Sequence, residues 1–522
     1  MKAPVLIVGA GPVGLTLAIA LKRRGVDLRI VEKAAARTDK SKALVIWPRT
    51  LELLDIQRCV QPFLDIGLKA TGARIRANGD TLVHLDLGVA QSVYPYALMV
   101  AQSETERLLE AQLASLGVEV ERQVELVSFT DDERGVTALL RHADGHDESI
   151  DAGWLAACDG AHSTVRHGLD LHFEGETLPS TWLLADVRLE GDVPADEVTI
   201  CWTADGVLAI FPIPGGRFRV IADIGDGGVG NIGGDLGDAH ASRHTAPQPP
   251  PSLGEVQAVL DQRGPPGLTV HDDVWLARFA INERKVKSYR HGHVFLAGDA
   301  AHIHSPAGGQ GMNTGMQDAI NLAWKLALVW HDDAAPSLLD SYSPERSAIG
   351  EQVLRNAGNM TRVALIRNPV LQEIRSLAAG ALGKIPALRR KMVDQLTELD
   401  LHYADSPLTA SPHGAARHPA AGHRAPDVPL NGAAGGTNGT IDNATRLHDL
   451  LASGRFVVLA VGAPAPVLSP AVKGIAVAAS ADSAEGYEPG HLYLIRPDAY
   501  LAMSTRAGDM APIAEALQRI AG

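Results

Sequence analysis

Short apolar runs alternate with segments of helical periodicity along the first part of the chain. Residues 5–8 are a run of aliphatic, largely β-branched residues, and residues 28–31 are aliphatic apart from Arg29; such runs are typical of strands. Between them, residues 15–24 have a helical pattern that ends before Gly25. The pattern therefore predicts a β-α-β unit whose two strands lie parallel in one sheet.

The apolar stretch over residues 3–21 also has the general character of a signal peptide or a membrane anchor. Its glycines and Pro12 interrupt it, and the basic residues 22–24 continue the same helix, so we favour the β-α-β interpretation. No other apolar run approaches the roughly 18 residues that a bilayer span needs. We therefore expect no membrane partner.

The rest of the chain continues these patterns. Helices are predicted at 51–59, 102–116 and 314–330, with helical patterns to about residue 402. Strands are predicted at 124–129, 136–140, 154–158 and 294–297, and an antiparallel hairpin at 207–213 and 218–224. Residues 226–251, rich in Gly and Pro, are predicted to be a loop. Near the end, strands are predicted at 456–461 and 491–495 and a helix at 510–521.

This order of elements predicts an α/β protein with interleaved parts. We expect a Rossmann-type nucleotide-binding domain over 1–170 and 281–345, split by an antiparallel-sheet substrate domain over 171–280. Part of 70–100 is a candidate to join that sheet. A helical segment over 346–402, a linker over 403–422 and a C-terminal unit over 423–522 follow.

Composition narrows the classes of function. The 522 residues are 46% hydrophobic and 21% charged, an ordinary globular balance, and the net charge of −14 makes nucleic acid a poor partner. Cys59, Cys158 and Cys201 are too few and too far apart for a disulfide framework or a metal site, and the 20 histidines show no metal-ligand spacing. We therefore expect no metal, and a reducing, cytoplasmic location.

A glycine-rich turn joins the first predicted strand to its helix. It reads Gly9-Ala10-Gly11-Pro12-Val13-Gly14, and Glu32, with Lys33 beside it, ends the second strand. In such a unit the glycines allow a tight turn, close backbone approach to a pyrophosphate and helix–strand packing. The helix N-terminus attracts the anion, and the acid accepts hydrogen bonds from ribose hydroxyls. The motif predicts dinucleotide binding; the alternative is a turn that serves packing alone.

Two further signatures follow in order. They are Asp159-Gly160-Ala161-His162-Ser163-Thr164-Val165-Arg166 and Gly298-Asp299-Ala300-Ala301-His302. Together with the first motif they resemble the group A flavoprotein aromatic hydroxylases of the p-hydroxybenzoate hydroxylase type, over about residues 1–400. The string 298–321 looks most like the branch that contains phenol and polychlorophenol monooxygenases. The resemblance implies that residues 423–522, which contain no Cys, form a thioredoxin-like unit without redox cysteines.

The resemblance implies an FAD site built from these motifs. Asp299 would accept hydrogen bonds from ribityl hydroxyls, and its alternative role is a helix N-cap. Asp159 would act near the pyrophosphate and the nicotinamide donor through ribose, water or Arg166, and Arg166 is equally a candidate structural partner of Asp159. Glycines would let backbone approach the flavin ring, and a helix N-terminus would face its pyrimidine. The further FAD-binding candidates are Gly160, Gln102, Gly298, Pro306, Gly309, Gly311, Met312 and Asn313.

One position departs from the family pattern. The family usually has Arg in a Ser-Arg-Ala segment that touches the cofactor, whereas this chain has Ser41-Lys42-Ala43. Lysine keeps the positive charge but loses the bidentate fork of arginine. The alternative is that Lys42 is a solvated surface lysine.

The substrate pocket is expected between the inserted sheet and the flavin. Trp47, Trp202 and Phe211 are candidates to line it, although each is more often a core residue. His304 is a candidate proton acceptor from a phenol, with a hydrogen-bonded loop histidine as the alternative. Pro306 resembles the proline that lies beside the flavin on the substrate side.

The resemblance implies an FAD-dependent monooxygenase that uses NADPH or NADH and O2 to hydroxylate an aromatic substrate, phenol-like or polycyclic, through a flavin C4a-hydroperoxide. The alternatives are epoxidation or Baeyer–Villiger oxidation of a polyketide-like substrate, and a non-catalytic flavin-binding protein. A homodimer is the assembly that the family favours. The sequence does not distinguish NADH from NADPH, because no second dinucleotide motif is present.

Overall fold

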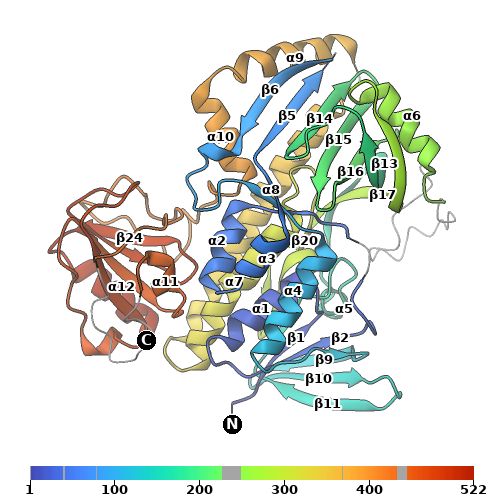
Figure 1. Cartoon of the computed structure of the whole chain (residues 1–522). Helices are drawn as coiled ribbons and strands as arrows, with labels where there is room; N and C mark the ends of the chain where they lie inside the picture. The colour runs from blue at the N-terminus through green and yellow to red at the C-terminus, as the bar shows by residue number, and fades with distance from the viewer. Residues whose placement is uncertain (1, 39–40, 78, 226–248, 367, 432–443) are drawn as a thin grey trace.

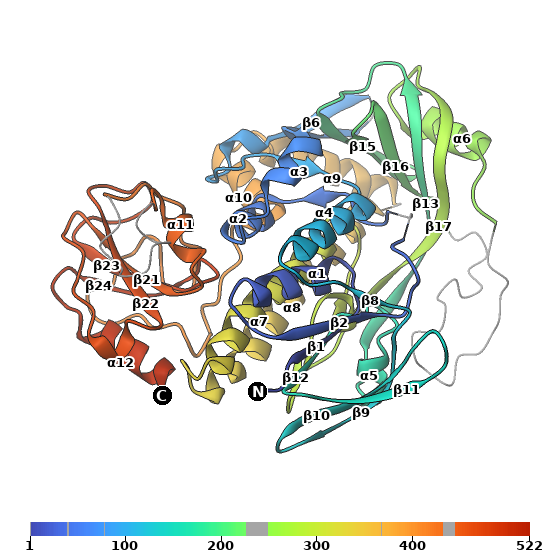
Figure 2. The same cartoon turned by 60° about the horizontal axis from the view of Figure 1, so that its bottom comes forward.

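The computed structural model describes residues 2–38, 41–77, 79–225, 249–366, 368–431 and 444–522. The predicted loop at 226–251 lies mostly outside the described residues. Figures 1 and 2 show three parts: a central α/β body, a large sheet at one end of it, and a C-terminal unit at its side. No helix among the described residues is long and apolar enough to cross a membrane.

The central body is built on a six-stranded sheet of order β18-β19-β12-β1-β2-β8. Its strands pair in parallel except at the β18 edge, and β1, at the centre, is buried along its whole length. The predicted β-α-β unit is therefore confirmed. The strands are β1 (Val5–Val8), β2 (Leu28–Glu32), β8 (Glu121–Arg122), β12 (Trp154–Ala157), β18 (Arg290–His291) and β19 (Val294–Leu296).

Helices pack against one another over this sheet. Helix α1 lies between α4 and α7, and α2 lies against α7 (Figure 2). Helices α2 and α7 begin three residues earlier than predicted; Pro48 provides the pre-set φ of a first helical residue in α2. The helices are α1 (Pro12–Lys22), α2 (Pro48–Ile56), α3 (Gln61–Ile66), α4 (Gln102–Ser115), α5 (Thr164–Gly168) and α7 (Gly311–Trp330).

Two smaller sheets flank the body. An antiparallel one, β9 (Glu125–Asp132), β10 (Gly135–Arg141) and β11 (Asp147–Ala152), lies at the bottom of Figure 1. The other has the order β3-β7-β4. Its strands are β3 (Val45–Ile46), β4 (Leu68–Ala70) and β7 (Ala97–Met99).

The large sheet has eight strands in the order β20-β17-β13-β16-β15-β14-β5-β6. It is antiparallel except where β14 pairs with β5, and it contains the predicted hairpin as β15 and β16. Residues from the 70–100 region form its β5–β6 edge. The strands are β5 (Gly72–Ala77), β6 (Asp80–Asp86), β13 (Glu174–Glu190), β14 (Glu197–Thr203), β15 (Gly206–Ile213), β16 (Arg217–Asp223), β17 (Thr269–Lys285) and β20 (His302–Ile303).

Four further helices surround this sheet. Helix α6 (Leu253–Arg263) packs on β15 and β17, and its start is a capping box of Ser252 and Glu255. Helix α8 (Tyr342–Ala364) leads back from the central body, and α9 (Pro369–Leu382) and α10 (Pro386–Leu396) contact β6 (Figure 1).

The C-terminal unit has a four-stranded mixed sheet of order β22-β21-β23-β24. Two predicted strands and the final helix are confirmed, the helix within one residue. The arrangement is the thioredoxin-like one that the resemblance implies. The elements are α11 (Leu447–Leu451), β21 (Phe456–Val461), β22 (Ala476–Ala481), β23 (His491–Ile495), β24 (Leu501–Arg506) and α12 (Ala511–Ala521).

The segment 403–422, predicted as a linker, connects the body to this unit but is also packed against it. The backbone N–H of Ala410 donates to the carbonyl oxygen of Ala502 at 3.0 Å, and that of Ala416 donates to Ser504 Oγ at 2.9 Å. The Tyr403 side chain is buried. The segment therefore follows the edge of the C-terminal sheet.

Candidate active site

The glycine-rich turn after β1 uses its three glycines in different ways. Gly9 has φ +100°, and a Cβ there would lie 2.4 Å from the carbonyl oxygen of Cys158 at the end of β12. A Cβ at Gly14 would lie 2.0 Å from the carbonyl oxygen of Gly9. A Cβ at Gly11 meets nothing within 4 Å. Packing therefore requires Gly9 and Gly14, whereas Gly11 borders open space next to Pro12 and the start of α1, where an anion can approach.

Glu32 closes this turn from the end of β2. Its carboxylate accepts hydrogen bonds from the backbone N–H groups of Ala10 and Ala34, each at 2.9 Å. Each carboxylate oxygen retains a second lone pair for a hydroxyl. Lys33 is exposed beside it. The acid at the end of the second strand thus lies against the glycine turn, as the motif predicts.

Asp159, just after β12, contacts the first turn of helix α5, whose N-cap is Ser163. Its Oδ2 accepts from the Val165 N–H at 3.2 Å, while its buried Oδ1 has no hydrogen-bond partner in the protein. Burial raises the pKa of this carboxyl, and hydrogen bonds from Ser163 and the α5 backbone oppose the shift. Gly160 has φ +76° and borders open space. The unpaired oxygen is a candidate contact for a hydroxyl of the cofactor or the donor.

Arg166 makes no ion pair or hydrogen bond with Asp159 in the described structure, so of its two open roles the one as structural partner of Asp159 finds no support. Its guanidinium is buried and donates to the carbonyl oxygens of Ala161 at 2.8 Å and Ala300 at 3.4 Å. It also stacks on Phe173, 4.1 Å from the ring centroid. Its buried Nε has no hydrogen-bond partner among the described residues, but the two carbonyl contacts join the Asp159 turn to the Gly298–Ala300 turn through Arg166.

The third motif forms a short 3-10 turn, Gly298–Ala300, after β19. Asp299 caps no helix here. The Asp299 side chain is accessible to solvent. Surrounding protein nevertheless desolvates the carboxyl group and raises its pKa, whereas the nearby charges of His302 and Lys42 act to lower it. Gly298 has φ +60°, and a Cβ there would lie 2.7 Å from Val13 on α1. The turn is therefore fitted onto α1, with one carboxylate free to accept hydrogen bonds.

Lys42 is exposed, and the segment around it is fixed on both sides. The backbone N–H of Gln102 donates to Ser41 Oγ at 2.7 Å, and Gln102 Oε1 accepts from the Ala43 N–H at 3.1 Å. On the other side, Arg219 Nη1 donates to the Lys42 carbonyl oxygen at 2.9 Å. Gln102 thus acts on the protein's own backbone, and the Lys42 ammonium remains available beside Asp299.

The loop before α7 brings several predicted residues together. Asn313 is fully buried, and its amide donates to the carbonyl oxygens of Val45 at 2.8 Å and Gly309 at 3.0 Å. These bonds join the loop to β3, so Asn313 positions the site rather than facing open space. Gly309 has φ +64° and lies against Val45 and Trp47. Pro306 is exposed, and Gly311 and Met312 are half-buried.

His304 lies beside this loop with its ring against Gly311. Its Nδ1 is 3.1 Å from the carbonyl oxygen of Ser305, and its Nε2 is buried without a partner. Burial, with a contribution from His302, lowers the pKa of His304 to about 4. An imidazole with this pKa is a weak base near neutral pH, which disfavours the proton-acceptor hypothesis and fits a loop histidine.

The three candidate substrate residues share one apolar cluster between the β3-β7-β4 sheet and the β14–β15 strands. Trp47 is buried and its Nε1 donates to the Gly308 carbonyl oxygen at 2.8 Å. Trp202 and Phe211 are only partly buried at the edge of the cluster, and the Arg375 guanidinium lies 4.7 Å from the Trp202 ring centroid. Trp202 and Phe211 therefore remain candidates for substrate contact, whereas Trp47 is a core residue.

Sequence reasoning missed a buried polar group behind the site. The Asp318 carboxylate accepts from the Gly298 N–H at 3.0 Å, from Arg346 Nε at 2.6 Å, and lies 2.7 Å from His302 Nε2. All three side chains are at most 1% exposed. A signal exists in the sequence, because polar residues recur every three or four positions along the otherwise apolar α7. They are Thr314, Gln317, Asp318, Asn321 and Lys325.

Comparison with known proteins places this geometry in a family. Residues 2–357 match the family model described as FAD binding domain, and residues 418–522 match the model described as aromatic-ring hydroxylase, C-terminal. The chain is 37% identical over 412 residues to 6-methylpretetramide 4-monooxygenase from Streptomyces rimosus, covering 78% of this chain and 71% of that protein.

The chain belongs to the family of FAD-dependent aromatic-ring monooxygenases.

Two further relatives illustrate the range of this monooxygenase family. Pentachlorophenol 4-monooxygenase from Sphingobium chlorophenolicum is 31% identical over 432 residues, which are 82% of this chain and 76% of that protein. The solved structure of the anhydrotetracycline hydroxylase OxyS from Streptomyces rimosus has a TM-score of 0.77 and 30% identity, and covers 100% of this chain and 99% of that one. The C-terminal unit is therefore shared with full-length relatives.

The residues of this FAD-dependent monooxygenase fit an FAD molecule. Open space at Gly11 and Gly160, an unpartnered oxygen on Asp159 and an accessible carboxylate on Asp299 lie at the carboxyl ends of neighbouring strands β1, β12 and β19. Ligands of open α/β sheets bind at this edge. Lys42 supplies a positive charge beside Asp299 in an otherwise acidic chain.

Proposed function

We propose that this monooxygenase uses NADPH or NADH together with O2 to hydroxylate a phenolic ring, either isolated or fused into a polycyclic polyketide. The observation that carries the proposal is the convergence of the three flavin motifs at the carboxyl ends of β1, β12 and β19. Relatives named for 6-methylpretetramide, anhydrotetracycline and pentachlorophenol support the substrate class.

The chain's own residues hold the cofactor in this proposal. The start of α1 at Gly11 presents backbone N–H groups to the pyrophosphate, Glu32 accepts from ribose hydroxyls, and Asp299 accepts from the ribityl chain. Bound FAD supplies hydride acceptance from the nicotinamide and oxygen transfer to the ring. Lys42 offsets the negative charge of the phosphates as a point charge, without the bidentate geometry of an arginine.

Helix α7 contributes electrostatics and the loop before it contributes shape. The helix is 20 residues long and has no acidic residue in its first turn, so its positive end is not neutralised. Aimed at the flavin pyrimidine, that end stabilises the negative charge that develops on reduction. The glycines at 308, 309 and 311 keep the loop free of side chains, which lets its backbone approach a planar ring.

The substrate site lies, in this proposal, between the flavin and the large sheet. Trp202 and Phe211 form a partly buried apolar wall that suits an aromatic ring. Arg375, over the Trp202 ring, places a cation near that wall, which favours a phenolate over a phenol. A phenolate ring is the more electron-rich target. We also propose a cytoplasmic location, because all three cysteines are buried and unpaired.

The purified protein tests the proposal directly. We expect FAD to co-purify or bind on addition, and NADPH or NADH oxidation to rise with phenols or with hydroxylated tetracyclic compounds. Mass spectrometry under 18O2 should find one labelled oxygen in the product. NAD(P)H oxidation that yields only hydrogen peroxide with every compound would contradict the hydroxylase assignment, and ring expansion or an epoxide would favour the alternative reactions.

A matched pair of variants tests the site. Asp299→Ala should weaken FAD binding by about tenfold or more, because charged acceptors contribute about 1.5–3 kcal/mol per hydrogen bond. Asp205→Ala, at an exposed aspartate in the β14–β15 turn, should leave FAD affinity unchanged. Equal affinities in the two variants would remove Asp299 from the site.

A further inference from the structure

The C-terminal unit contacts helix α7 through buried polar groups. Asn321 Nδ2 and Trp324 Nε1 both donate to Asp498 Oδ2 at 3.0 Å. One helical turn from Asn321, Lys325 Nζ donates to Glu345 Oε2 on α8 at 2.7 Å. The side of α7 that faces the C-terminal unit is therefore bonded to it, rather than packed by apolar contact alone.

Arg496 connects these acceptors. Its two terminal nitrogens donate to the two oxygens of Glu345, each at 2.8 Å, and its Nε donates to Asp498 Oδ1 at 3.0 Å. The side chains of Arg496, Lys325 and Glu345 are 0% exposed and that of Asp498 is 3% exposed. The two cations, Arg496 and Lys325, thus neutralise the two anions, Glu345 and Asp498, in the interior, and Arg496 donates hydrogen bonds to both anions.

Helix α7 also contributes a buried polar group, Asp318, on the side of the proposed flavin site. Asp318 accepts from the Gly298 N–H and from Arg346, and Arg346 Nη1 donates to the Tyr403 hydroxyl at 2.8 Å. The Tyr403 ring lies 4.9 Å from the Arg496 guanidinium. A continuous set of buried groups therefore runs from the Gly298–Ala300 turn to the C-terminal unit.

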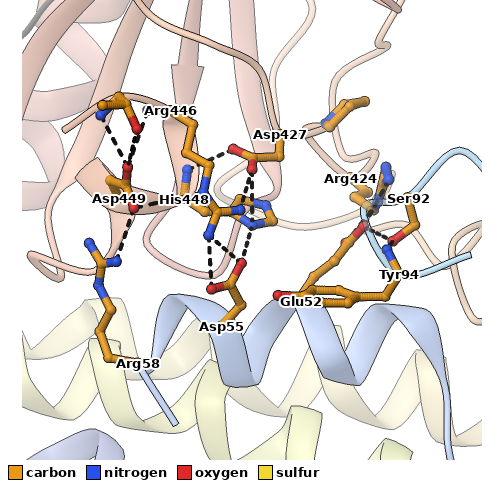
Figure 3. A network of polar contacts seen from close by, with 12 residues as sticks. Glu52, Asp55, Arg58, Ser92, Tyr94, Arg424, Asp427, Arg446, His448 and Asp449 are labelled. Atoms are coloured by element: carbon orange, nitrogen blue, oxygen red, sulfur yellow. Dashed lines mark hydrogen bonds and ion pairs between the residues drawn. The ribbon is translucent and has the colours of Figure 1, made fainter. Parts of the chain in front are cut away.

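A second group of ion pairs joins the same two parts of the molecule elsewhere (Figure 3). Arg424 donates to Glu52 at 3.0 Å, and Arg446 donates to Asp55 at 2.7 Å, both acceptors being on α2. Arg424 is buried like Arg496, but its ion-pair partner Glu52 is on α2, whereas Arg496 pairs with Glu345 on α8 and with Asp498 in its own unit. One buried arginine, Arg496, therefore binds the two carboxylates that accept from α7 side chains, and another, Arg424, binds a carboxylate on α2.

We propose that Arg496 and Asp498 are positioning residues for the flavin, and that the C-terminal unit, which has no cysteine for redox chemistry, braces the α7 end of the FAD site. The proposal rests on FAD occupying the site proposed above. Without Arg496, Glu345 and Asp498 keep one buried cation between them, so α7 shifts or water enters. Either change moves Asp318 and with it the backbone of the turn that carries Asp299.

Full-length Arg496→Met and Arg424→Met, each of which replaces a buried arginine by an uncharged, unbranched side chain, test the proposal. We expect Arg496→Met to weaken FAD binding by about tenfold or more and to shift the visible spectrum of the remaining flavin, as coupling between distant sites does. Arg424→Met should keep FAD affinity within about twofold while lowering the melting temperature. Arg496→Lys, which keeps the charge without the fork, should bind FAD with intermediate affinity.

FAD affinity is measured by fluorescence titration at a temperature where circular dichroism shows each variant folded. Equal FAD affinities in Arg496→Met and Arg424→Met would overturn the proposal. If Arg496→Met yields no folded protein, Asp498→Asn decides by the same comparison with Arg424→Met. A wild-type protein that binds no FAD would instead reject the proposed function, whereas wild-type binding with unchanged binding in Arg496→Met rejects the brace alone.

Discussion

The side-chain oxygen of Asn313 accepts a hydrogen bond from the backbone N–H of Trp47 at 2.9 Å, across 266 residues of sequence. The amide nitrogen of the same residue donates to the carbonyl oxygen of Val45. One buried amide thereby holds strand β3 against the first turn of α7. The loop that we propose faces the flavin ring is thus bonded to the strand behind it, which is the condition for a pre-organised site.

Asn313→Ala should therefore lower both the free energy of unfolding and the affinity for FAD. The substitution leaves the Trp47 N–H and the Val45 carbonyl buried without partners, and we expect a loss of at least about 2 kcal/mol in unfolding free energy. Thermal melts with and without FAD measure both effects. Asn359→Ala, at an exposed position on α8, is the control. An unchanged melting temperature in Asn313→Ala would show that the clamp does not contribute.

Substitutions of two glycines in the first motif should affect different properties: Gly11→Ala should weaken FAD binding, and Gly14→Ala should lower stability. Gly11→Ala is expected to fold normally, because its Cβ meets nothing within 4 Å and its φ is −76°. It should bind FAD weakly, because the methyl group would enter the space that we propose for the pyrophosphate. Gly14→Ala should lose about 1–3 kcal/mol or more of stability through its contact with Gly9. Denaturant unfolding of the FAD-free variants measures this difference. Full FAD affinity in folded Gly11→Ala would place the pyrophosphate elsewhere.

Glu398 should make the protein less stable as the pH rises. It is fully buried and accepts from Thr314 and Gln317 on α7, and burial raises its pKa to about 8. Between about pH 4.5 and 8 the folded protein keeps this proton and the unfolded chain does not, so stability falls with rising pH, by at most about 1.4 kcal/mol per pH unit. Glu398→Gln should flatten this slope in urea melts. A slope identical to wild type would mean that Glu398 is ionised when buried.

His304 should have the opposite effect at lower pH. Its pKa is lowered to about 4 by burial, so between pH 4 and 6.5 the unfolded chain binds a proton that the folded protein does not. Stability should therefore rise with pH through this window, and His304→Gln should reduce the slope. In kcat/KM profiles the variant should retain every ionisation seen near neutral pH. Loss of one of them would restore His304 as the proton acceptor.

The local motifs were predictable because short-range stereochemistry determines them. A left-handed Gly9 and a close approach at Gly14 follow from joining a strand to a helix in so few residues, and the hairpin at β15–β16 follows from two apolar runs around a Gly-Gly turn. The acid at the end of β2 lies where the spacing of the unit puts it. The α/β class and the resemblance to flavin monooxygenases were therefore accessible from residue order alone.

The sequence by itself determined the cofactor motifs and the order of elements, but the tertiary structure decided what each polar side chain does. Arg166 meets carbonyl oxygens instead of Asp159, and Asn313 and Gln102 bond to the protein's own backbone. Asn321 and Asp498, 177 residues apart, meet only after the C-terminal unit has docked on α7. These partners are determined by burial, because a polar group that is removed from water forms hydrogen bonds with the donors or acceptors that packing places beside it. The spacing of residues along the chain does not indicate which groups those will be.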